Sequence, residues 1–219
     1  MGTINTSGSA TVRTKADSAR VAFGVQTSAE TIKGARENHR ARVQKVMDGL
    51  LSLKLPDLKV ATSIVHVEMI YEYKSREMIE LPKLLGYRVT TNLAGTICDV
   101  DPSKLGNMTM QILDAALESG ATSVQHIVFS RMDDAEIRRQ ALAKAVEDAL
   151  QNARAIAEAA GVEIKGIQSI QPQPEYSSHY EYTSGLKRSL HRDTSLPEDT
   201  AVVAGDVEIT CTVEVVCTI

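Results

Sequence analysis

The end of the chain alternates strictly between apolar and polar positions. The apolar positions are Val207, Ile209, Cys211, Val213, Val215, Cys217 and Ile219. Polar or small residues stand between nearly all of them, which gives a period of two. The pattern predicts a long β-strand with one buried face, so this terminus is expected to be part of a core.

The start of the chain shows a weaker alternation that suggests a hairpin. Ile4, Gly8, Ala10 and Val12 alternate with polar residues, and Lys15-Ala16-Asp17 resembles a turn. Val21, Phe23 and Val25 then alternate again. Two such runs around a short polar break predict two paired strands.

Apolar residues at helical spacing predict three helices. The first starts at Ser28 or Thr31 as N-cap, and its stripe is Ile32, Ala35, His39, Val43, Val46, Met47 and Leu50. The second follows Asp101-Pro102, an N-cap with proline in the first turn, and ends near Gly120. Its apolar residues are Leu105, Met108, Ile112, Leu113 and Ala116.

The third predicted helix covers 134–160 and is rich in alanine. At the usual rise per residue it would be about 40 Å long. Its small residues are Ala141, Ala145, Ala149, Ala153 and Ala160. They predict close packing against a neighbouring helix or sheet, and Gly161 is expected to end the helix.

Three more strands are predicted, at about 65–71, 86–100 and 124–130. Strands mixed with helices on one face indicate an α+β fold with a mixed or antiparallel sheet. The strand–helix–strand order of 20–71 returns in 87–130, which suggests an internal duplication, although the residues do not repeat. We expect one domain over 1–219.

Two segments interrupt the pattern. Residues 74–85 form a charged loop, and 171–201 is a long insertion rich in serine and proline. Tyr176, Tyr180 and Tyr182 within the insertion are candidate contacts for a partner or for assembly. The alternative is a mobile excursion without a partner.

The charge pattern limits the kinds of partner that the chain is expected to bind. The net charge is −4, and the basic residues are dispersed except for Arg36, Arg40, Arg42 and Lys45 on the first helix. Such a run is usually a solvated helix face, and no aromatic residues accompany it for base stacking. We therefore expect no nucleic-acid partner. No segment has the ~20 consecutive apolar residues of a membrane span.

The sequence shows no recognisable catalytic or cofactor motif, so no catalytic residue, metal or cofactor is predicted. His66 and Glu68 share a strand face, but no third ligand is indicated, and a surface pair is the simpler interpretation. His39 lies on an apolar stripe and is expected to be a hydrogen-bonded core histidine. The acidic pair Asp133-Asp134 is expected to stabilise a helix start.

The three cysteines are interpreted as small buried hydrophobes. Cys211 and Cys217 lie on one face of the last strand, roughly 20 Å apart, and cannot bond to each other. Cys98 could pair with either one, so the redox compartment stays open.

Several motifs in a fixed order resemble the SIMPL-domain family. They are Gly8-Ser9-Ala10-Thr11-Val12, Asp17-Ser18-Ala19-Arg20-Val21, Gly86-Tyr87-Arg88-Val89, Leu113-Asp114-Ala115-Ala116-Leu117-Glu118-Ser119-Gly120-Ala121, Ala153–Val162 and Gly205-Asp206-Val207-Glu208-Ile209. Ala204 stands where the family tends to have proline. The resemblance covers nearly the whole chain except 74–85 and 171–201.

This resemblance implies a fold rather than a reaction, because the family is a domain of unknown function without agreed catalytic residues. It implies self-assembly into larger oligomers and a link to oxidative-stress tolerance. It also implies export to the periplasm or cell envelope. Residues 1–6 show no signal-peptide pattern, so a cytoplasmic location is expected if the chain is complete.

Two functions are therefore expected. The favoured one is a non-enzymatic, self-associating envelope protein, a homo-oligomer formed through 171–201 or an exposed sheet edge. The alternative is a small-ligand-binding protein or an enzyme, with a site built from separate segments. A cleft with convergent polar groups would favour this alternative.

Overall fold

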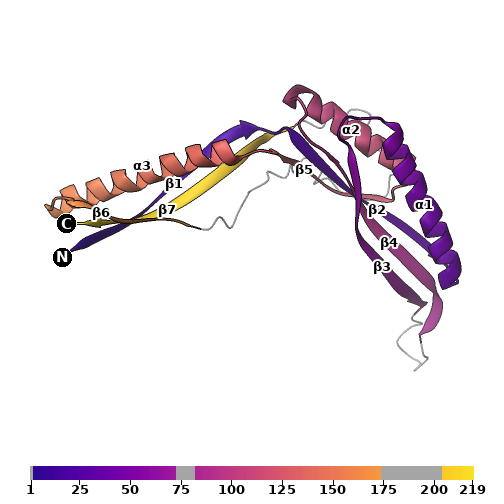
Figure 1. The fold of residues 1–219 in the computed structure, drawn as a ribbon. Coiled ribbons are helices and arrows are strands. Elements are labelled where there is room, and N and C mark those ends of the chain that lie inside the picture. The colour runs from indigo at the N-terminus through magenta and orange to yellow at the C-terminus, as the bar shows by residue number, and fades with distance from the viewer. Residues whose placement is uncertain (1, 73–81, 174–203) are drawn as a thin grey trace. The chain divides into compact units, whose positions relative to one another are not determined.

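The computed structural model describes residues 2–72, 82–173 and 204–219. Within them the chain forms three helices and two antiparallel sheets, as the α+β prediction requires. The chain divides into two compact units (Figure 1). The described part of the first unit is 2–16, 130–173 and 205–219, and the described part of the second is 17–72, 82–129 and residue 204.

The first unit is a three-stranded sheet covered by one long helix. Strands β1 (Thr3–Lys15), β7 (Asp206–Thr218) and β6 (Gly166–Pro172) lie in the order β1-β7-β6. Helix α3 (Ala135–Ala160) lies along β1 and β7 (Figure 1). The predicted alternation of the last strand is confirmed, since Val207 through Cys217 are buried at every second position.

The predicted N-terminal hairpin is wrong. β1 pairs antiparallel with β7 over its whole length, from Thr3 opposite Thr218 to Lys15 opposite Asp206. The next strand, β2 (Ser18–Ala29), belongs to the other sheet. The break at Ala16-Asp17 therefore separates two sheets rather than reversing one strand onto the next. Local alternation gives a strand's period but not its partner.

Alanine and glycine bring α3 unusually close to its sheet. The buried positions of α3 are Ala141, Ala145, Ala149, Ala153 and Ala157. Ala160, which the sequence pattern included, is exposed, because the four-residue step leads to Ala157 and leaves the last residue on another side. Opposite them, a Cβ on Gly8 would overlap the backbone of Ala145 and Ala149.

The second unit has the element order β-α-β-β-α-β of a ferredoxin-like unit. Strand β2, helix α1 (Ile32–Ser52) and strand β3 (Lys59–Glu72) precede strand β4 (Lys83–Ile97), helix α2 (Pro102–Glu118) and strand β5 (Ser123–Ser130). The sheet order is β3-β4-β2-β5. The repeat of strand, helix and strand is therefore present in the topology.

The two helices of this unit bury an aliphatic core against the sheet. Fully buried side chains come from every layer and include Val21, Phe23, Val46, Leu50, Leu93, Ile97, Leu105 and Ile112. The helix starts agree with the caps expected from sequence. Thr31 accepts a hydrogen bond from the Gly34 amide at 3.2 Å, and Asp101 accepts one from Ser103 at 2.8 Å.

The third helix begins at the acidic pair Asp133-Asp134, as the sequence predicts. Asp134 occupies the N-cap position but makes no side-chain capping bond. Its neighbour Asp133 accepts from the Ala135 amide at 3.1 Å, and Asp134 pairs with Arg138 at 2.8 Å. Gly161 ends the helix with a φ of 66°, as expected for a left-handed cap. None of the helices in the described ranges is long and apolar enough to span a membrane.

Candidate functional site: the groove between α1 and β3

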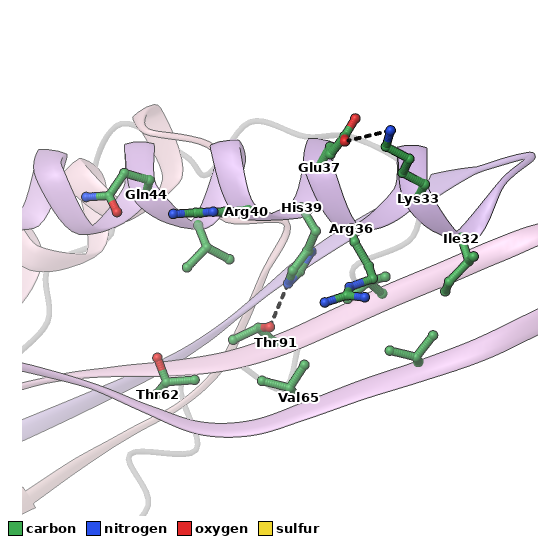
Figure 2. Close-up of a pocket in the computed structure, with 13 residues that line it drawn as sticks. Ile32, Lys33, Arg36, Glu37, His39, Arg40, Gln44, Thr62, Val65 and Thr91 are labelled. Atoms are coloured by element: carbon green, nitrogen blue, oxygen red, sulfur yellow. Dashed lines mark hydrogen bonds and ion pairs between the residues drawn. The ribbon is translucent and has the colours of Figure 1, made fainter.

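An open groove of about 670 Å³ lies between α1 and the outer part of the four-stranded sheet (Figure 2). α1 packs against β2 and β4. β3 is the edge strand beyond β4, so its helix-facing side chains form an open floor. The volume lies within the range of small-molecule sites.

The floor of the groove is apolar. Val65 and Val67 of β3 line it, with Val89 of β4 directly opposite Val67 in the register. The exposed fractions of Val65 and Val67 are 62% and 47%, whereas Val89 is 2% exposed. The two β3 valines are therefore an uncovered continuation of the core face.

A register shift in β3 adds a polar residue to the same floor. Thr62 lies opposite Leu93, and Ile64 lies opposite Asn92, so Ser63 is the extra residue of a bulge. The bulge places Thr62 and Val65 on the groove side, three residues apart instead of two. Figure 2 shows Thr62 and Gln44 at one end of the groove and Ile32 at the other. The floor of the groove is thus polar at the Thr62 end and apolar at Val65, while the rim carries Lys33 beside Ile32.

Basic residues from α1 form its rim. Lys33, Arg36 and Arg40 line the groove at spacings that keep them on one side of the helix. Lys33 lies 4.0 Å from Glu37, the one acidic residue among the lining side chains. Within the described part of the chain, Arg36 and Arg40 make no ion pair.

A buried histidine supports the inner wall. The Nε2 atom of His39 lies 2.6 Å from Oγ1 of Thr91, and its Nδ1 atom lies 3.1 Å from Oγ1 of Thr27. The two threonines belong to β4 and β2, so one imidazole ties α1 to two strands. Burial lowers the pKa of His39 below its ordinary value of 6.5. The core histidine expected from sequence is confirmed.

The hydrogen-bonded pair of His39 and Thr91 has a structural geometry and does not have the geometry of a nucleophile with its base. Thr91 is 2% exposed and His39 is 6% exposed, so a substrate carbonyl has no direct access to the hydroxyl. The second ring nitrogen meets a hydroxyl rather than the carboxylate of a catalytic triad. The described residues also contain no group of three His, Cys, Asp or Glu side chains placed to hold a metal ion.

Most of the residues singled out from the sequence do not line the groove. Tyr176, Tyr180 and Tyr182 lie outside the described residues. Glu68 points to the sheet face opposite the groove and pairs with Arg88 at 2.8 Å. The basic run on α1 divides, since Arg36 and Arg40 line the groove while Arg42 donates to the Gln26 carbonyl at 3.2 Å.

The amino-acid sequence does not predict the groove. The alternation of Val65, Val67, Met69 and Tyr71 predicts the strand, but nothing in it shows that this apolar face is left uncovered. Two signals could have suggested the site together. They are a basic i, i+4 pair on a helix stripe and an apolar strand without a further helix to cover it.

The cysteines occupy both units. Cys211 and Cys217 are buried on one face of β7, and Cys98 in the second unit is half-buried. Among the described residues, none of the three cysteines forms a disulfide. Burial raises the pKa of the Cys211 thiol, as expected for a small core residue.

Comparison with known proteins identifies the family of this α+β chain. Residues 4–217 match the SIMPL family, described as a protein of unknown function (DUF541). The chain therefore belongs to the SIMPL family, as its motifs suggested.

Two relatives show how far the likeness extends. The chain is 25% identical over 177 residues to "Uncharacterized protein YggE" of Edwardsiella ictaluri, covering 78% of this chain and 70% of that protein. It is 25% identical over 147 residues to the "26 kDa periplasmic immunogenic protein" of Brucella melitensis, covering 67% of this chain and 56% of the relative. The chain thus spans little more than half of the second relative.

Among solved structures, one similar chain is AtUAH in complex with glyoxylate. It is 10% identical, with a TM-score of 0.25, and the match covers 64% of this chain and 33% of AtUAH. A TM-score this low does not indicate a shared fold.

Proposed function

We propose that this SIMPL-family chain is a non-enzymatic, self-associating protein of the cell envelope, and that β3 is its assembly edge. The observation that carries this proposal is the character of β3, a 14-residue edge strand. Its outer backbone groups have no strand partner within the described sheet. Its exposed apolar side chains are Ile64, Val65, Val67, Met69 and Tyr71.

An edge of this length and composition is a template for another strand. Antiparallel pairing of β3 with β3 of a second copy would be symmetric, so both copies would present the same surface. Such a contact would satisfy backbone donors and acceptors and would also bring apolar side chains of the two strands side by side. Two four-stranded sheets would then become one continuous sheet.

Light scattering tests this edge most simply. We expect the intact chain to form a dimer or larger oligomer at micromolar concentration. Ile64→Lys places a charge on the edge and should give a monomer, because lysine blocks strand addition. Leu51→Lys on α1 is the matched control, since Leu51 is 57% exposed and Ile64 59%. A monomeric wild-type protein would contradict the proposal.

The insertion predicted at 171–201, whose first two residues form the end of β6, provides a second proposed contact. Tyr176, Tyr180 and Tyr182 are its candidate residues for assembly or for a protein partner. A chain lacking 175–200 separates the two routes. If the mass falls on deletion but not in Ile64→Lys, the insertion rather than β3 carries the assembly.

A periplasmic or envelope location is proposed together with this function. The relative named as a periplasmic protein supports it. Cell fractionation of the producing organism tests the location directly. The oxidative-stress role implied by the resemblance is tested by peroxide survival of a deletion strain complemented with wild type or with Ile64→Lys.

Binding of a small ligand is the second candidate function. The groove between α1 and β3 favours it, because an apolar floor and a cationic rim converge there. This function needs neither the strand edge nor an oligomer.

A further inference from the structure

We propose that the groove between α1 and β3 binds a single-chain amphipathic anion, namely a fatty acid in its carboxylate form. The carboxylate lies between Arg36 and Arg40, and the hydrocarbon chain runs along the valine floor towards Ile32. This proposal goes beyond self-association and is independent of it.

The rim supplies more positive charge than the groove itself neutralises. Of the lining residues, Lys33 is offset by Glu37 at 4.0 Å. Arg36 and Arg40 remain without an ion pair among the described residues. Side chains at i and i+4 on a helix are neighbours, about 6 Å apart at Cβ, so both guanidinium groups can reach one carboxylate. Guanidinium forks bind carboxylates with paired hydrogen bonds.

The floor suits a hydrocarbon chain. Val65 and Val67 are 62% and 47% exposed, and Val67 lies directly opposite the buried Val89. Met69, which is 55% exposed, follows Val67 on the same face of β3. A chain lying along these residues would cover apolar surface that is now open to water.

The ends of the groove give the ligand a direction. On the floor, Thr62 lies at the end with Arg40 and Gln44, and Val65 lies nearer the end with Ile32, where the rim carries Lys33 (Figure 2). A fatty acid has one charged head and one apolar tail, and it therefore matches this asymmetry.

A peptide strand fits the groove less well than a fatty acid. The groove opens on the face of the sheet, and β3 and β4 are already paired beneath it. A strand added at the free edge of β3 would lie beside the groove rather than in it. The floor offers apolar side chains, which a hydrocarbon chain can use without needing backbone hydrogen bonds.

Calorimetric titration with dodecanoate, kept below its micellar concentration, tests the proposal on the intact chain. We expect saturable binding at one site per chain. Arg36→Gln/Arg40→Gln should weaken binding by about tenfold or more, since charge-assisted bonds are lost. Arg42→Gln removes one charge from the same helix outside the groove, and should change the affinity by less than about twofold. Methyl dodecanoate, which lacks the charge, should bind at least about tenfold more weakly than dodecanoate.

The contact between the hydrocarbon tail and the floor is tested by varying the chain length of the ligand and by substituting a floor residue. Each methylene buried on the floor should tighten binding by up to about fourfold, until the groove is filled. Val67→Asn should weaken dodecanoate several-fold while leaving the thermal midpoint close to that of wild type, because Val67 is half exposed.

Three results would overturn the proposal. They are no binding of dodecanoate by the wild type, equal binding of the methyl ester, and unchanged affinity in the double arginine variant. Binding only to anionic lipid vesicles, and not to free dodecanoate, would assign the groove to a membrane surface and would also overturn it. Because Ile64 points away from the groove, a monomeric Ile64→Lys variant should bind dodecanoate like wild type. Ligand binding and self-association can therefore fail separately.

Discussion

The Nε2 atom of His39 and the Oγ1 atom of Thr91 lie 2.6 Å apart and join α1 to β4 along the inner wall of the groove. Both side chains are buried, so neither can exchange its partner for water. The position of Arg36 and Arg40 over the valine floor depends on how α1 sits on the sheet. This one contact therefore couples the stability of the second unit to the geometry of its groove.

Replacing Thr91 by valine should destabilise the second unit. Valine has nearly the same volume but cannot accept or donate a hydrogen bond, so a buried imidazole nitrogen would lose its partner. We expect a loss of about 1–3 kcal/mol in the free energy of unfolding, measured by urea denaturation.

Thr90→Val is the matched control for this change, because Thr90 is the preceding residue of β4 and points to the other face, where it is half-buried. Its effect should stay within about 0.5 kcal/mol. Equal effects at both positions would show that the His39 contact contributes nothing specific.

His39 should also make stability depend on pH. Because burial lowers its pKa in the folded protein, the unfolded chain takes up a proton at higher pH than the folded one. The stability due to neutral His39 is complete above the ordinary value of 6.5 and is lost as the pH falls below it. Urea unfolding at a pH above and a pH below this value should show a larger loss for wild type than for His39→Gln.

The carboxylate of Asp134 contributes to the pH dependence of stability in a different, more acidic range. Its hydrogen bond from Arg138 lowers its pKa from the ordinary value of 3.8, so its contribution disappears only in more acidic solution. The comparison of wild type with His39→Gln should therefore be made above the titration range of the acids. If the two proteins lose stability equally, His39 is not the group responsible.

Alanine substitutions at Gly8 and Gly161 should lower stability for different reasons. The first lacks space for a Cβ, and the second must adopt a left-handed backbone conformation. Gly8→Ala forces a Cβ into the backbone of α3, so β1 and α3 must separate, which strains the hydrogen bond that Thr6 donates to the Ala149 carbonyl at 3.0 Å. We expect a loss of about 3 kcal/mol or more in the free energy of unfolding.

Gly161→Ala meets no atom within 4 Å but must adopt a φ of 66°. We expect a cost of about 1 kcal/mol, from conformation alone. Gly166→Ala, with its nearest neighbour at 3.6 Å, serves as the control and should change little. A larger loss in the free energy of unfolding for Gly161→Ala than for Gly8→Ala would contradict the close packing described for α3.

The thiols should react in an order set by burial. Cys98 is half-buried, whereas Cys211 and Cys217 are 1% and 0% exposed. Alkylation of the native protein followed by mass spectrometry should label Cys98 first. Labelling of Cys211 or Cys217 should appear only under denaturing conditions. Early labelling of Cys217 would mean that β7 opens readily.

The sequence predicts single elements better than it predicts their pairing. Thr31, Asp101-Pro102 and Gly161 mark helix ends through local chemistry, which the chain carries at those positions. The partner of β1 is more than 190 residues away, as the pairing of Thr11 with Thr210 at a separation of 199 shows. No local pattern encodes that choice.

The site was harder to predict for the same reason. Helical spacing places Arg36 and Arg40 on one face of a helix, and a period of two places Val65 and Val67 on one face of a strand. That these faces meet follows from the sheet order β3-β4-β2-β5, which leaves β3 uncovered at the edge. Coverage is a property of the assembled layers, and hydrophobic periodicity does not report it.

Hydrogen exchange of the β3 amides at several protein concentrations tests self-association through this edge most directly. The amides of Lys59–Glu72 that point away from β4 should be protected at high concentration and exposed on dilution, because another copy pairs with them. In Ile64→Lys they should exchange quickly at every concentration. Protection that does not change with concentration, or fast exchange throughout in wild type, would contradict the claim that β3 is the assembly edge.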